Sequence, residues 1–222
     1  MTDREIDEVL AREAERLSGP AIPAPPREIK PVRPMASRWM WFAAFLGVFA
    51  AVSVGGAMVL GAYGFRELVP MERGLIFGAA AAVACLAALA LVREMFPASG
   101  RRISGFALLV SIVVLLATFA VVFQNYDMDQ FFPRGLRCLR AGLIFAIPAA
   151  VVFLLLVRRG FVVSLPAIGM AVGTLAGLAG VGVLEMHCPI FNAMHVMVWH
   201  LGVIAICGGA GWIIGRFLQR VH

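Results

Sequence analysis

The chain has 222 residues, of which 61% are hydrophobic and 14% are charged, and its mean hydropathy is +0.91. Soluble domains contain about 45–50% apolar and about 25% charged residues, so this composition excludes an ordinary soluble domain. The net charge of +6 would suggest nucleic-acid binding in a soluble chain, but here the arginines stand between apolar runs, where they act as topology signals. The composition therefore indicates a polytopic membrane protein without a direct nucleic-acid partner.

Residues 1–18 are predicted to form a cytoplasmic amphipathic helix. Thr2 and Glu5 have the spacing of a capping box, and Gly19-Pro20 ends the pattern. Helices that lie on anionic lipid usually carry basic residues, whereas this one is net acidic, so we expect it to dock in a groove of a cytosolic protein, with the lipid surface as the alternative. The expected contact residues are Ile6, Val9, Leu10, Glu13 and Leu17.

A proline-rich linker, residues 19–38, leads to a six-helix transmembrane bundle over residues 39–222. The polar residues before the first apolar run argue against a cleaved signal peptide. The six predicted spans are about 39–63, 74–92, 103–124, 141–157, 161–184 and 195–215.

Lys and Arg near the span ends predict the orientation, because cytoplasmic loops carry the excess of basic residues. With both termini in the cytoplasm, eleven basic residues face inward: Arg27, Lys30, Arg33, Arg38, Arg93, Arg101, Arg102, Arg158, Arg159, Arg216 and Arg220. Five face outward: Arg66, Arg73, Arg134, Arg137 and Arg140. The expected location is a bacterial inner membrane, with Asp127, Asp129 and the loop from Glu185 to Met194 outside.

Small residues dominate the fifth predicted span. Gly169, Gly173 and Gly177 recur every four residues, a spacing that lets a neighbouring helix approach closely. We expect this stretch to let the fourth span, bent at Pro148, shift against the fifth. No predicted span places a charged residue at mid-membrane depth, which disfavours a small-molecule transporter.

Cysteine and histidine gather at the predicted outer ends of three spans. Cys138 opens the fourth span, His187 and Cys188 close the fifth, and His195 and His200 begin the sixth. Three interpretations remain open: polar caps, a redox-responsive pair of Cys138 and Cys188, or a metal site of His187, Cys188, His195 and His200. On an ideal helix His195 and His200 are about 140° apart, so they are not expected to face one ion. Paired histidines at depth, as a haem requires, are not expected either.

The chain resembles the NrsF-type membrane anti-sigma factors of bacteria. The likeness covers roughly residues 39–215 and is carried by Arg137-Cys138-Leu139, Gly142-Leu143, Pro148, Arg158-Arg159-Gly160, Pro166, His187-Cys188, His195 and Trp199-His200. The resemblance implies a protein that holds an extracytoplasmic-function sigma factor at the membrane. It also implies release after an outer signal such as a heavy metal or an oxidant, with Cys138 and Cys188 as candidate sensors.

Two classes of function follow from these features. The first is a signalling protein, not an enzyme, that sequesters a cytosolic sigma factor through residues 1–18. The second is a membrane redox protein that uses the outer cysteine pair, although Cys85 and Cys207 stand alone on separate spans and offer no second pair. The chain requires no cofactor beyond a possible metal ion.

Overall fold

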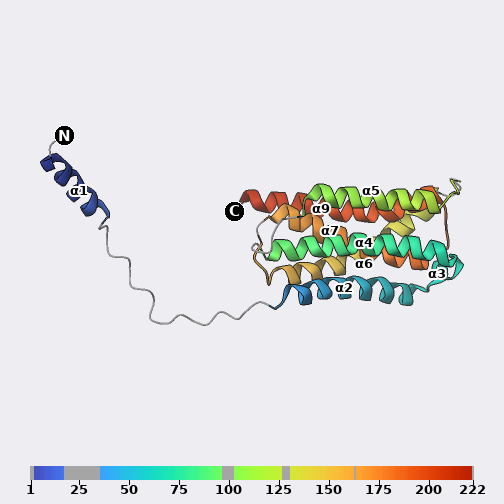
Figure 1. Cartoon of the computed structure of the whole chain (residues 1–222). Coiled ribbons are helices and arrows are strands. Elements are labelled where there is room, and N and C mark those ends of the chain that lie inside the picture. The colour runs from blue at the N-terminus through green and yellow to red at the C-terminus, as the bar shows by residue number, and fades with distance from the viewer. Residues whose placement is uncertain (1–2, 18–35, 97–102, 127–130, 163, 222) are drawn as a thin grey trace. The chain divides into compact units, whose positions relative to one another are not determined.

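The computed structural model describes residues 3–17, 36–96, 103–126, 131–162 and 164–221 (Figure 1). Within these ranges the fold is all-α, as predicted, with a single isolated β-bridge between Asn125 and Asn192. The chain divides into two compact units, Met1–Pro34 and Met35–His222. Thr2, most of the predicted linker, and the loop with Asp127 and Asp129 lie outside the described residues.

The first unit contains helix α1 (Asp3–Leu17). Its apolar side chains are exposed: Ile6 by 38%, Val9 by 59% and Leu10 by 60%. Glu13 is exposed as well, whereas the side chain of Leu17 lies outside the described part of the chain. The three exposed apolar side chains lie on one face of an amphipathic helix.

The described residues of the second unit form six helical segments long and apolar enough to cross a membrane, which confirms the predicted number of spans. A short helix, α3 (Tyr63–Glu67), connects the first two. The last segment combines α8 (Ala193–His195), the π-helical turn η2 (Val196–His200) and α9 (Leu201–Val221). The other five are α2 (Arg38–Leu60), α4 (Pro70–Met95), α5 (Gly105–Val122), α6 (Phe131–Val157) and α7 (Leu165–His187).

Helix α6 begins at Phe131, well before the predicted start of the fourth span at residue 141. The apolar run does start near residue 141, but the helix extends beyond it because arginine is a good helix former. Arg134, Arg137 and Arg140 are all exposed on these additional turns. Cys138 therefore lies inside α6 and does not open it, and the helix continues through Pro148.

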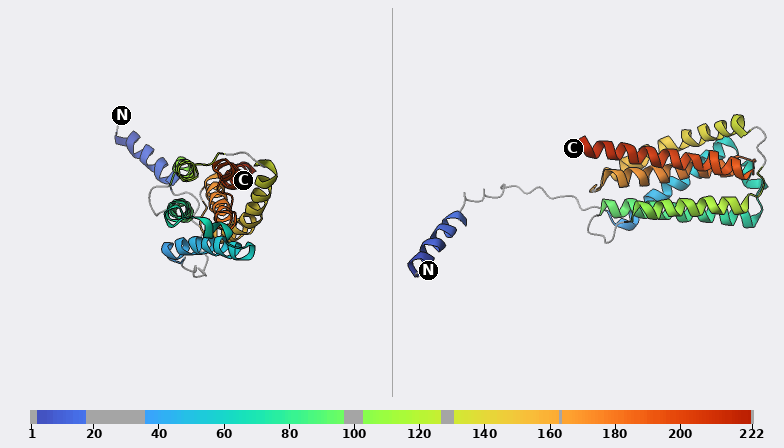
Figure 2. Two further views of the ribbon diagram at one scale, coloured as in Figure 1. Left: turned by 90° about the vertical axis from the view of Figure 1, so that its right-hand side faces the viewer. Right: turned by 90° about the horizontal axis from the view of Figure 1, so that it is seen from above.

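Helix α7 is the centre of the bundle and packs against α2, α4, α6 and α9 (Figure 2). Every side chain from Ala171 to Glu185 is buried. By contrast α5, at the periphery, buries few side chains and presents Phe106, Val113 and Val121 outward. The apolar surface of the outer helices is what a lipid environment covers.

Three glycines of α7 form a seam with α9. A Cβ at Gly169 would clash with the carbonyl oxygen of Gly211, and one at Gly173 with that of Cys207. A Cβ at Gly177 would come within 2.7 Å of Cα of Ile204. The glycines therefore serve close helix packing, but the neighbour is α9. Gly169 and Gly173 also line an apolar groove beside α6, and the expectation that this stretch lets the fourth span shift against the fifth stays a prediction.

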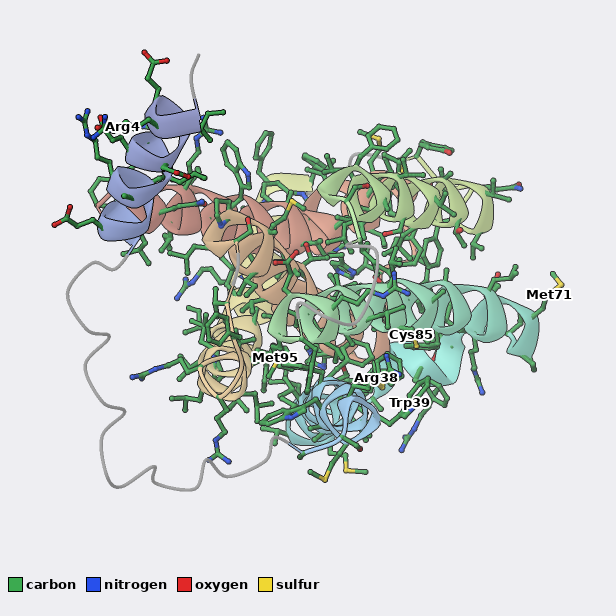
Figure 3. The ribbon with its side chains drawn as sticks, turned by 60° about the vertical axis from the view of Figure 1, so that its left-hand side comes forward. Arg4, Arg38, Trp39, Met71, Cys85 and Met95 are labelled. Carbon is green, nitrogen blue, oxygen red and sulfur yellow. The ribbon has the colours of Figure 1, made fainter. Side chains whose placement is uncertain are left out.

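The bundle has two ends that differ in content. The proximal end carries the start of α2, with Arg38 and Trp39, and the end of α4, with Met95 (Figure 3). The distal end carries α3, the start of α4 near Met71, the start of α6 and the end of α7 (Figure 3).

Candidate functional site at the distal end

Four metal-ligating side chains from three spans converge at the distal end. Their ligand atoms all lie within 4.8 Å of one another. We call this group the distal cluster, and its members are Cys138 of α6, Cys188 directly after α7, His195 of α8 and His200 of η2.

The contacts within the distal cluster are close and shielded. The sulfur atoms of Cys138 and Cys188 are 3.8 Å apart, and Sγ of Cys188 is 3.7 Å from Nε2 of His195. Cys188, His195 and His200 are buried, and Cys138 is half-buried. All four cysteines of the chain lie within the described residues and are free thiols.

The turn η2 brings the two histidines together. Their ring centroids are 5.1 Å apart, so the expectation from an ideal α-helix that they point in different directions is wrong. In η2 the backbone N–H of Leu201 donates to the carbonyl of Val196, five residues earlier. A π-helical turn holds more residues than an α-helical one, so residues five apart come closer to alignment. Such turns are rare and frequently mark functional sites.

Glu185 is a functional candidate that sequence reasoning missed. It was expected in the outer loop, but it lies in the last turns of α7 and is 3% exposed. Its Oε1 is 2.7 Å from Nδ1 of His200, which is 1% exposed. Nε2 of the same ring has no hydrogen-bond partner within the described part of the chain. An acidic residue inside an otherwise apolar run was the signal that could have identified it, because a buried carboxylate requires a partner.

His187, which was proposed as a metal ligand, lies outside the distal cluster. Its Nδ1 is 2.9 Å from the carbonyl oxygen of Gly61, and its ring packs against Tyr63 at 5.8 Å between centroids. This side chain fastens α3 to the end of α7. A Cβ at Gly64 would clash with the carbonyl oxygen of Cys188, so α3 presses directly on the backbone of the distal cluster.

Loops and aromatic rings cover the same end. The backbone N–H of Ala193 donates to the carbonyl of Asn125 over 2.7 Å, which joins the loop after α5 to the loop after α7. Phe123 stacks on Phe191, with ring centroids 5.6 Å apart. Burial of Cys188, His195 and His200 at this end keeps these side chains from solvent, and low polarity strengthens the electrostatic interactions among them.

The other two cysteines, Cys85 and Cys207, lie outside the distal cluster. Cys85 is exposed on α4 (Figure 3), and Cys207 takes part in the α7–α9 seam.

In the distal cluster, the pKa of the Cys188 thiol is raised, chiefly by its hydrogen bond with Cys138 and to a lesser extent by burial. A raised pKa leaves less thiolate, which is the form that oxidants attack.

The arrangement permits two kinds of chemistry. Two thiols in contact can be oxidised to a disulfide and reduced again. Two thiolates and two imidazoles can also surround a thiophilic metal ion.

The family of the chain is indicated by its match to one family model. Residues 27–220 match the model described as NrsF, negative regulator of sigma F. The match covers the bundle and begins after α1. Neither a curated protein nor a solved structure matches the chain.

Proposed function

The chain belongs to the NrsF family of negative regulators of sigma F, and from this premise we propose that it is a membrane anti-sigma factor with an outer stress sensor. In this proposal α1 sequesters the sigma factor in the cytoplasm, and the distal cluster receives a heavy-metal or oxidant signal outside. The observation that carries the proposal is the family match over most of the bundle. The family is regulatory and is not a class of enzymes.

The surface of α1 supports its role as the sigma-binding element. Ile6, Val9 and Leu10 are exposed and follow the spacing by which helices bind in grooves. The acidic residues suit a sigma factor, because proteins that bind DNA carry basic surfaces. A basic group on the partner would also explain why Glu13 interrupts the apolar face.

The arginine bias supports the orientation. The proximal end carries the larger number of basic residues, so it belongs in the cytoplasm, with both termini there and an inner membrane around the bundle. The distal cluster then faces the outside, where reversible thiol chemistry and metal exposure occur.

The connection between sensor and output follows from the contacts of three helices. The distal cluster joins α6 to the ends of α7 and α8, whereas the α7–α9 seam holds those two helices backbone to backbone. Toward the proximal end an apolar groove of 360 Å³ opens between α6 and the α7–α9 pair, lined by residues such as Leu154, Ile168 and Ile214. A signal that pulls Cys138 would therefore move α6 against a fixed pair. Coupling between such sites typically amounts to about 1–3 kcal/mol.

Leu10→Glu tests the role of α1. Burying one leucine contributes roughly 1.5–3 kcal/mol, so capture of the sigma factor should fall by about one to two orders of magnitude. The measurement is crosslinked co-purification of the sigma factor from intact cells, which also requires α1 to be cytoplasmic. Ala11→Glu adds the same charge beside the apolar face and should retain capture. Equal capture by wild type and Leu10→Glu would overturn α1 as the binding element.

A further inference from the structure

We propose that the distal cluster is a closed four-ligand site for a thiophilic divalent metal ion and that Glu185 is its positioning residue. The inference rests on the proposed function in one respect, because it names the signal ligand of the same site. It adds a ligand set, a class of metal and a residue outside that set.

The spacing of the ligand atoms fits tetrahedral coordination. With Zn–S bonds of about 2.3 Å and Zn–N bonds of about 2.0–2.1 Å, a tetrahedron has an S···S edge of about 3.8 Å and an S···N edge of about 3.6 Å. The S···S distance between Cys138 and Cys188 is 3.8 Å, and the S···N distance between Cys188 and His195 is 3.7 Å. Two edges therefore already have the length that an ion at the centre requires.

The donor set selects the metal. Two sulfur and two imidazole ligands in a tetrahedral arrangement are typical of zinc and related soft ions, and exclude magnesium and calcium, which prefer oxygen. Two thiolates balance a divalent charge. With an ionised Glu185 the two thiolates and the carboxylate carry three negative charges. A divalent ion then leaves the site with one net negative charge, and a monovalent ion leaves it with two. Because uncompensated charge is costly in a buried site, the arrangement favours a divalent ion such as zinc or cadmium.

The hydrogen bond with Glu185 determines which ring nitrogen of His200 can bind a metal ion. When Nδ1 of His200 donates to the Glu185 carboxylate over the contact of 2.7 Å, the neutral ring carries its hydrogen on Nδ1. In that tautomer Nε2, the other ring nitrogen, has a free lone pair. It is buried and has no partner among the described residues, and a metal ion in the distal cluster would supply one. Carboxylates that fix ligating histidines in this way are a recurrent feature of zinc sites.

The test is metal titration of the full-length chain in detergent micelles. Co(II) is the probe, because thiolate ligation gives it charge-transfer and tetrahedral ligand-field absorption, and competition with Zn(II) and Cd(II) then gives their affinities. Wild type should bind one Co(II) with this spectrum. Glu185→Ala should lose about 10–100-fold in affinity, as is typical when such a partner is removed. Glu185→Gln keeps an oxygen that accepts from Nδ1 and should stay near wild type.

Glu94→Ala is the matched control. Glu94 is also a buried glutamate, at the proximal end of α4, and its removal should leave the Co(II) affinity unchanged. Where Glu185→Ala fails to fold, Glu185→Asp carries the test, because its shorter side chain draws the acceptor away and should weaken binding relative to Glu185→Gln.

Two results would overturn the inference: wild type that shows no thiolate-ligated Co(II), or Glu185 variants that all bind as wild type does. Sigma-factor retention is measured on the same samples. Release by an oxidant without any metal binding would overturn the metal site and leave the proposed function standing. Tight metal binding in a chain that never captures a sigma factor would overturn the proposed function and leave the metal site standing.

Discussion

The distal cluster and the α7–α9 seam both join α7 to the last span, but they do so by different physical means. In the seam, glycine lets backbone contact backbone, as where Gly211 faces the carbonyl of Gly169. In the distal cluster, side chains from three spans meet: the two sulfur atoms are 3.8 Å apart, and Sγ of Cys188 is 3.7 Å from Nε2 of His195. Backbone packing of the first kind is rigid because interiors resist small changes in volume. The second kind can exist in two states, with and without a bond or an ion. On the proposed function, the seam is scaffold and the distal cluster is the adjustable part.

The largest expected effect comes from removing a thiol of the distal cluster. Cys138→Ser or Cys188→Ser removes a soft ligand and half of a thiol pair, so metal binding is weakened and a disulfide between the two positions cannot form. Induction of the sigma factor's target gene by cadmium or by oxidant should disappear in both variants. The measurement is a transcriptional reporter in cells.

Cys85→Ser and Cys207→Ser are the controls for this experiment. One of these thiols is exposed on α4 and the other lies in the seam, so both variants should respond as wild type does. Normal induction in both variants of the distal cluster would show that its cysteines are structural, and the comparison with the seam would then fail.

Much of the fold could be predicted because membrane helices follow simple rules. Apolar length gave the six spans, and the four-residue glycine spacing gave a close helix contact. The identity of the neighbouring helix could not be predicted, because spacing on one helix does not reveal its partner. The start of α6 was misplaced for a related reason: hydropathy marks where lipid begins, whereas a helix rich in arginine extends beyond it.

The candidate site was predictable in composition and not in geometry. Cysteines and histidines near span ends could be assigned to one end of the bundle, yet 50 residues separate Cys138 from Cys188, and their contact depends on tertiary packing. The convergence of His195 and His200 depends on η2, which an ideal helical wheel does not include. Glu185 was assigned to a loop because charge usually ends a span, and its pairing with His200 explains the exception.

A smaller effect is expected from adding one methyl group to the seam. Gly211→Ala places a Cβ against the carbonyl oxygen of Gly169, and overpacking of this kind costs about 1–3 kcal/mol. Gly209 on the same helix has no atom within 4 Å of an added Cβ, so Gly209→Ala should be neutral or more stable, by up to about 1 kcal/mol, because alanine favours helix. Both changes in stability are measured by unfolding the purified variants with a denaturing detergent. Equal stability of the two variants would mean that the seam tolerates movement, contrary to its role as scaffold.

The smallest effect is expected from His187→Ala, which tests whether His187 lies outside the distal cluster. This residue is adjacent to Cys188 in sequence, but its imidazole contacts the carbonyl of Gly61 and the ring of Tyr63. His187→Ala should therefore cost about 0.5–1.5 kcal/mol of stability, which is the usual net contribution of one hydrogen bond. Because no ligand is lost, Co(II) affinity and cadmium induction should match wild type, whereas His195→Ala should lose both. Loss of Co(II) binding in His187→Ala would place this histidine among the ligands and would extend the adjustable region to α3.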